Sequence, residues 1–187
     1  MRGTQDYKME TKKYIYNVTG CLIHPFVTRL AQITQNNSWH TKTALEHTLA
    51  VYHRAKEEGE TDSFLVATLL HDIGKYTTRR EDEKGETHFP NHEAVGYHLA
   101  NGILSPTISN RNMILSIIQD HGIVHAHTLS GKMPIEFAYP EELRRFCLYE
   151  VETSRLQKTN PEEYLARKLL LEAKTGDYSG IKINGLF

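Results

Sequence analysis

The apolar segment LVATLL (65–70) constrains the fold of this chain more than any other feature, because His71 and Asp72 follow it directly. Thr61 provides a capping signal before the segment and Gly74 follows it, which is typical of a helix. The helix is apolar almost all round, so we expect it to lie buried at the centre of the fold. Burial of a charged side chain is costly unless the charge is paired or bound to a metal ion. His71 and Asp72 therefore need partners from elsewhere in the chain.

Helical spacing of apolar residues recurs along most of the 187 residues. We expect further helices at 24–35, 43–59, 91–104, 109–122, 140–157 and 161–176, polar loops at 75–90 and 124–134, and a short strand or extended arm at 177–187. The sequence therefore predicts an all-α fold. We expect one compact helical bundle over residues 1–187, with a core at about 39–158, an N-terminal helix, and a C-terminal helix plus tail.

The charge balance and the cysteine content narrow the class of protein. Lys and Arg total 22 and Asp and Glu total 23, a formal charge of −1, which argues against a large nucleic-acid surface. Cys21 and Cys147 are too few for a disulfide framework or a cysteine-based zinc site. No run approaches the length of a membrane span, and the polar first 18 residues lack the apolar stretch of a secretory signal. We expect a cytoplasmic protein without a membrane partner.

Histidine is unusually frequent, with 11 residues spread from His24 to His127, roughly two to three times the average usage. Several histidines and acids fall at helix ends or on inward faces of separate expected helices. These candidates are His47, His71, Asp72, His92 and His121, and the acidic pair Glu150 and Glu152. Helical bundles build metal sites from inward residues of facing helices. Imidazole with carboxylate suits Mn, Fe, Co, Ni or Zn.

Two features of this set indicate a second ion. Neighbouring residues on a regular helix point about 100° apart, so His71 and Asp72 reach one place only if the turn before Gly74 loosens. An aspartate there can bridge two ions. A mononuclear site would leave His92 and His121 without a role. We expect the remaining histidines to lie at the surface or behind the ligands: His53, His88, His98, His125 and His127, with His125 the most plausible exception because it lies four residues after His121.

This order of residues resembles the HD superfamily of metal-dependent phosphohydrolases, in which a His, a His-Asp pair and a late acid follow one another. The segments ALEHTLAVYHRA, ATLLHDIGK and TTRREDEKGETHFPNHEAVGYHLA are most similar to the HD domains of bacterial CCA-adding tRNA nucleotidyltransferases, over residues 39–121. The nucleotidyltransferase part is absent, so the resemblance implies a stand-alone HD domain. Tyr76 stands where close relatives commonly have proline.

The resemblance implies a phosphohydrolase that acts on a small nucleotide or phosphodiester, of phosphatase or 2′,3′-cyclic phosphodiesterase type, through a water activated by two divalent ions. It implies Asp72 as the residue that orients the hydroxide. It also places Glu152 where the family usually has aspartate, and we prefer Glu152 to Glu150 as the late ligand because Cys147 and Leu148 fall near its face.

Three basic residues follow the His-Asp pair. We expect Lys75, Arg79 and Arg80 to bind the substrate phosphate, although charged loop residues are often only solvated. Two other functions stay open at this point. A minority of HD proteins are mixed-valence di-iron oxygenases, and a glutamate that spoils the site would leave a non-catalytic metal-containing binding module.

Overall fold

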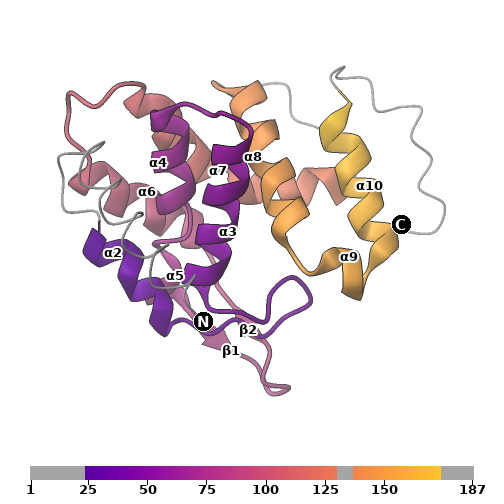
Figure 1. Ribbon diagram of the computed structural model, residues 1–187. Coiled ribbons are helices and arrows are strands. Elements are labelled where there is room, and N and C mark those ends of the chain that lie inside the picture. Colours follow the sequence, from indigo (N-terminus) through magenta and orange to yellow (C-terminus); the bar gives the residue numbers. More distant parts are fainter. Residues whose placement is uncertain (1–23, 130–136, 174–187) are drawn as a thin grey trace, which may run out of the picture.

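The computed structural model describes residues 24–129 and 137–173, and within these ranges the chain is all-α (Figure 1). The elements are α2 (His24–Arg29), η1 (Leu30–Gln32), α3 (Ala44–Glu57), α4 (Asp62–Leu70), α5 (Lys75–Thr78), β1 (Arg80–Glu81), β2 (Thr87–His88), α6 (His92–Ile103), α7 (Arg111–Leu129), α8 (Pro140–Thr153), α9 (Leu156–Thr159) and α10 (Pro161–Glu172). The expected arm at 177–187 lies outside the described residues.

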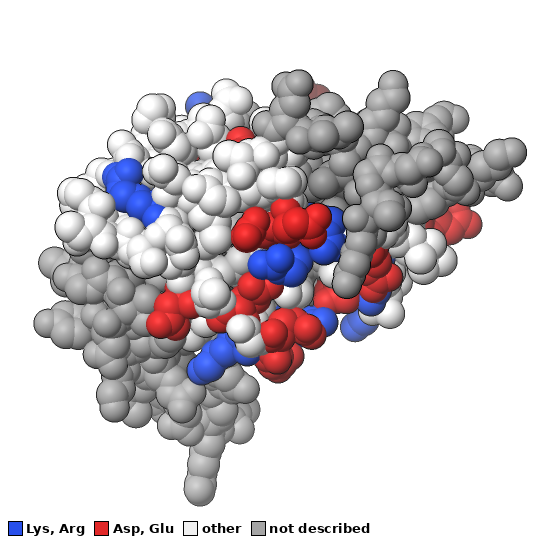
Figure 2. Space-filling view, turned by 90° about the horizontal axis from the view of Figure 1, so that it is seen from above, with Lys and Arg blue, Asp and Glu red and all other residues white. Residues whose placement is uncertain are grey.

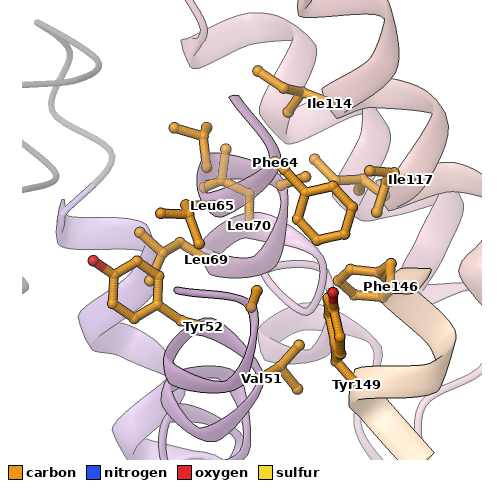
Figure 3. Close-up of a cluster of buried hydrophobic side chains, with 14 of the residues drawn as sticks. Val51, Tyr52, Phe64, Leu65, Leu69, Leu70, Ile114, Ile117, Phe146 and Tyr149 are labelled. Carbon is orange, nitrogen blue, oxygen red and sulfur yellow. The ribbon is translucent and has the colours of Figure 1, made fainter. Parts of the chain in front are cut away.

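Helix α4 is the buried centre that the sequence predicts. Every residue from Ser63 to Leu70 is buried, and the Thr61 side chain caps the helix by accepting from the Phe64 backbone N–H. Figure 3 shows its leucines and Phe64 packed against side chains from α3, α7 and α8. Each fully buried side chain of this size stabilises the fold by about 1.5–3 kcal/mol relative to exposure. The turn after α4 is therefore held firmly in the middle of the bundle.

The helices around α4 bring distant parts of the sequence together. Helix α7 packs against α4, α6 and α8, while α3 packs against α4 and α8, and α10 lies on α8. A capping box fixes the start of α3, because Thr43 accepts from the Glu46 backbone N–H and the Glu46 carboxylate accepts from the Thr43 backbone N–H. Side chains from α3, α4, α6, α7 and α8 can therefore meet inside one bundle.

Two segments differ from the sequence-based expectation. Helix α7 continues to Leu129, so the loop expected from residue 124 begins later. The polar segment expected as a loop at 75–90 contains α5 and an antiparallel hairpin that pairs Arg80 with His88 and Glu81 with Thr87. Gly85 turns the hairpin with a φ of +77°, a conformation that glycine adopts at no steric cost.

The surface shown in Figure 2 carries acidic and basic side chains side by side, next to an area that is largely uncharged. No described helix is both long enough and apolar enough to cross a membrane.

Candidate metal centre

The first two candidate ligands come directly after the end of α4. The last helical residue is Leu70, and residues 71–74 form turns that lead into α5. Because the backbone leaves the regular helix here, both side chains reach the same region, and His71 Nε2 lies 3.2 Å from Asp72 Oδ2. Both residues are buried. The loosened turn expected from the sequence is present.

Gly74 lets α6 start against this turn. A Cβ atom at Gly74 would lie 2.0 Å from the His92 carbonyl oxygen and 2.7 Å from the Gly96 backbone nitrogen, separations that no side chain tolerates. The close approach brings His92 Nε2 to 3.5 Å from Asp72 Oδ1. Because residue 74 is a glycine, α6 can lie close enough to the turn for His92 to face Asp72.

One group of candidate ligands comprises His47, His71 and Glu150, all buried. His47 Nε2 lies 3.4 Å from His71 Nε2, and Glu150 Oε1 lies 3.5 Å from both of these nitrogens. The three side chains come from α3, from the end of α4 and from α8. Their atoms surround one small volume between three helices.

A second group comprises Asp72, His92 and His121. His92 Nε2 lies 3.3 Å from His121 Nε2 and 3.5 Å from Asp72 Oδ1. The other carboxylate oxygen of Asp72 faces His71 of the first group. Asp72 therefore lies between the two groups and faces both of them.

Three of the imidazoles are oriented by the same backbone contact. The Nδ1–H of His71 donates to the Thr68 carbonyl at 2.8 Å, and the equivalent bonds run from His92 to Phe89 and from His121 to Ile118, at 2.9 and 3.0 Å. Each acceptor lies three residues before its histidine. A carbonyl can only accept, so Nδ1 carries the proton and, in the neutral ring, Nε2 offers a lone pair. Such contacts behind a ligand fix its tautomer and direction.

These separations fit ions held between the side chains. Two nitrogens bound tetrahedrally at about 2.1 Å to one ion lie about 3.4 Å apart, close to the 3.3 Å between His92 Nε2 and His121 Nε2. Without a cation or a proton between them, the two lone pairs would repel one another. Asp72 Oδ1 is also buried without a hydrogen-bond partner among the described residues, a costly state that a metal ion would relieve. The residues therefore fit divalent metal ions.

Three of the four candidate histidine ligands have a lowered pKa, which favours the neutral form that binds metal ions at neutral pH. Burial lowers the pKa of His47 and of His121, and burial together with the Lys75 charge lowers the pKa of His92 to about 3. His71 differs, because the Asp72 carboxylate outweighs its burial and raises its pKa.

The carboxylates stay ionised in spite of their burial. Burial alone would raise the pKa of Asp72, but His71 and Lys75 outweigh it and hold that pKa well below its usual range. His125 has the same effect on Glu150. Neutral imidazoles beside ionised carboxylates are the forms that bind metal ions.

A family model described as "HD domain" matches residues 44–170. The chain belongs to the HD domain family. HD domains belong to a superfamily of metal-dependent hydrolases and bind divalent metals. The two groups of candidate ligands described above agree with this property. No curated protein and no solved structure matches the chain.

The structure turns Glu150 toward the other candidate ligands, so the prediction that Glu152 is the inward-facing glutamate is wrong. The Glu152 carboxylate lies outside both ligand groups and pairs with Arg54 Nε at 2.8 Å and Lys168 Nζ at 2.9 Å. Glu150 lies on the apolar stripe of α8, three residues after Cys147 and four after Phe146. That i, i+3, i+4 spacing was the signal that identifies Glu150 from sequence.

His125 supports Glu150 from behind the cluster. Because α7 continues past residue 124, His125 lies one turn after His121, and its Nε2 is 2.8 Å from Glu150 Oε2. The edge of its ring meets Trp39, with ring centroids 5.1 Å apart. Among the histidines not expected to be ligands, His125 was the most plausible exception, and it does contact a candidate ligand.

Lys75 lies beside the candidate ligand Asp72, and its expected contact with a substrate phosphate stays a prediction. It is buried, its Nζ lies 2.8 Å from Asp72 Oδ2, and it donates to Gln35 Oε1 at 2.9 Å. The ammonium also lies over the Phe89 ring. Gln35 was missed from the sequence, because nothing in the segment before α3 indicates that it reaches a site 40 residues further along the chain.

The pocket beside the two groups has a volume of about 260 Å³ and contains more than the expected ligands. Its lining comprises Trp39, His40, Asp72, Lys75, His92, Glu93, His121, Gly122, His125 and Glu150. The His40 ring packs on His47, with centroids 4.1 Å apart, and burial holds the pKa of His40 well below its usual range. His40 and Glu93 were not singled out in the sequence.

The structure does not bring Arg79 or Arg80 into this lining. Arg79 pairs with Glu81 at 2.7 Å, and Arg80 is exposed in β1. The hairpin that follows α5 directs both side chains to neighbours of their own, so of the three basic residues only Lys75 lies at the pocket.

Proposed function

We propose that this HD domain is a metal-dependent phosphohydrolase for a small nucleotide or phosphate ester, acting as a phosphomonoesterase or a 2′,3′-cyclic phosphodiesterase. One observation carries the proposal: two neighbouring ligand groups meet where Asp72 of one group faces His71 of the other, and the ammonium of Lys75 lies directly beside Asp72. Paired ions that clamp the two sides of a phosphoryl displacement are a recurrent solution for this chemistry.

The proposal assigns two divalent transition-metal ions, chosen from Mn, Fe, Co, Ni and Zn by the imidazole and carboxylate ligands. His47, His71 and Glu150 would hold one ion, and Asp72, His92 and His121 would hold the other. A bound ion of this kind lowers the pKa of a coordinated water toward neutrality and polarises the phosphoryl oxygen.

Charge supports the need for ions in a phosphate site. The pocket lining contains the carboxylates of Asp72, Glu93 and Glu150 and a single ammonium, that of Lys75. With neutral histidines this lining is negative and would repel a phosphate. Two divalent ions reverse the sign, and the anion then binds favourably.

The side chains of the domain supply position and charge. Asp72 lies between the two groups and would orient the attacking water, while His125 contacts the outer oxygen of Glu150. Lys75 has three N–H donors, and Gln35 and Asp72 engage two of them. The third is available to neutralise charge on the phosphate.

The nucleotide class is supported by the resemblance of the EHTL, LLHDIGK and HEAVGYHLA segments to the HD domains of CCA-adding enzymes. Those segments contain His47, the His71–Asp72 pair, Lys75 and His92.

The test is a substrate screen with metal-free protein reloaded separately with Mn²⁺, Co²⁺, Ni²⁺, Zn²⁺ or Fe²⁺. We expect phosphate release from p-nitrophenyl phosphate, nucleoside monophosphates or 2′,3′-cyclic nucleotides with at least one ion, and none from Asp72→Asn. Failure of every loaded form on every ester would refute the proposal. Oxygen consumption by the iron form, measured in parallel, would instead indicate an oxygenase.

A further inference from the structure

Glu93 lies in the pocket wall with a carboxylate to which no described residue donates a hydrogen bond. It is the second residue of α6, and its side chain is 24% exposed. The nearest histidine nitrogen is His92 Nδ1, 3.3 Å from Oε2, but that N–H donates to the Phe89 carbonyl. The carboxylate is partly exposed toward the pocket, so it can accept a hydrogen bond from a molecule bound there.

Glu93 reaches this place because the facing residue on α7 is a glycine. A Cβ atom on Gly122 would lie 1.9 Å from Glu93 Oε1 and 2.8 Å from its Cδ. A glutamate in a first helical turn is stabilised by the helix dipole even when it points into solvent. Here the side chain instead occupies the space that the glycine leaves beside the pocket.

The imidazole of His92 separates Glu93 from the candidate metal centre. Its Nδ1 edge faces Glu93, while its Nε2 faces His121 and Asp72. The Glu93 carboxylate is thus about one ring away from the ligand atoms. It does not belong to either ligand group, but it is within reach of the organic part of an ester whose phosphate lies at the centre.

We propose that Glu93 determines specificity by accepting a hydrogen bond from a sugar hydroxyl of the substrate. The inference rests on the proposed phosphohydrolase function and narrows its substrates to phosphorylated nucleosides or sugars with a free hydroxyl. An ionised carboxylate only accepts hydrogen bonds, so it pairs with a hydroxyl and repels a further phosphate group. Hydroxyl-bearing monophosphates are therefore favoured over polyphosphates.

The test compares adenosine 5′-monophosphate with its 2′,3′-dideoxy analogue in wild type and Glu93→Gln. Both substrates leave through a primary 5′-oxygen, so an effect on leaving-group protonation would be similar for the two. We expect Glu93→Gln to lower kcat/KM for the ribonucleotide at least about tenfold, chiefly through KM, because a charged hydrogen-bond acceptor is replaced by a weaker neutral amide oxygen. The dideoxy substrate should change by less than about twofold.

Gly122→Ala should reproduce this selective loss, because the new methyl group displaces the carboxylate. Gly102→Ala on α6 is the matched control, since nothing lies within 4 Å of a Cβ atom there. Glu93→Gln should keep its full metal content. A fall in metal content would overturn the inference by showing that Glu93 serves the ions.

The outcomes separate this inference from the proposed function. If wild type hydrolyses p-nitrophenyl phosphate but Glu93→Gln affects both nucleotides equally, or if neither nucleotide is hydrolysed, the specificity role is wrong and the phosphohydrolase stands. If no ester is hydrolysed with any metal, both fail together.

Discussion

At the scale of single residues, direction matters more than residue type. His71, His92 and His121 each donate Nδ1–H to the carbonyl three residues earlier, and this contact aims Nε2 into the centre. The sequence indicates these histidines through their places at the ends of expected helices, although α7 continues past His121, but the contacts that orient them depend on side-chain rotation. Gln35, His40 and Glu93 were missed for a related reason, because only tertiary packing brings them to the pocket.

The two glutamates of α8 allow a matched comparison at this scale. Glu150→Gln replaces a carboxylate ligand by a neutral amide, so we expect loss of at least half of the bound metal. Glu152→Gln should keep its metal, because that carboxylate pairs with Arg54 and Lys168. Elemental analysis of both purified variants gives the comparison. Loss of metal from Glu152→Gln alone would show that α8 is rotated by about half a turn from its position here.

Lys75→Met tests the proposed phosphate contact. The change removes the ammonium but keeps a long apolar stem, so we expect the metal content to stay and kcat/KM for phosphate esters to fall about a hundredfold. Lys84→Met, at an exposed position in the hairpin, serves as the control. Full activity of Lys75→Met would exclude Lys75 from substrate binding.

At the scale of elements, the centre depends on how closely α6 approaches the turn after α4. Gly74→Ala places a methyl group against the His92 carbonyl oxygen, so α6 must shift. We expect destabilisation by about 1–3 kcal/mol and a lower affinity for the ion held by His92 and His121. Urea unfolding and metal titration measure both effects, with Gly102→Ala as the unstrained control. Wild-type stability and affinity in Gly74→Ala would contradict the close approach.

Glu152 has a structural role at this scale, because its ion pairs join α8 to α3 and α10. Burial alone would raise its pKa, but Lys168 and Arg54 lower the pKa below its ordinary value of 4.5. The folded state therefore binds this proton less readily than the unfolded state, and the stabilisation is present above pH 4.5 and lost as the pH falls further.

We expect Glu152→Gln to lower the free energy of unfolding by about 1 kcal/mol at pH 7 and by less at pH 3. Urea titrations of wild type and variant at the two pH values provide the measurement. If wild type and variant differed in free energy of unfolding by the same amount at both pH values, the charge of Glu152 would contribute nothing to stability.

Helix types and positions were largely predictable, whereas two details were not. The buried LVATLL segment and the apolar stripes gave the all-α bundle, since periodicity reflects burial directly. The choice between Glu150 and Glu152 failed because the family position and the neighbours Cys147 and Leu148 were followed in preference to the buried stripe through Phe146 and Cys147, on which Glu150 lies. The end of α7 was placed too early because Gly122 was read as the end of the helix, whereas the helix continues through it to Leu129.

At the scale of the whole molecule, the centre ties together parts of the chain that are far apart in sequence. His47 and Glu150 are separated by 103 positions, yet both face the turn that follows α4. Ions bound at this junction stabilise the folded state only, so the melting temperature should rise with metal concentration. Ions bound between these side chains would also compensate the cost of burying so many ionisable groups.

The central claim is that two ligand groups joined by Asp72 hold two divalent ions. The most direct measurement is the number of ions per chain, obtained by equilibrium dialysis of metal-free protein against Mn²⁺ or Co²⁺ followed by elemental analysis. We predict about two ions in wild type and about one in His92→Ala, since the group of His47, His71 and Glu150 stays intact. A single ion in wild type that His92→Ala leaves unchanged would contradict the two-ion centre.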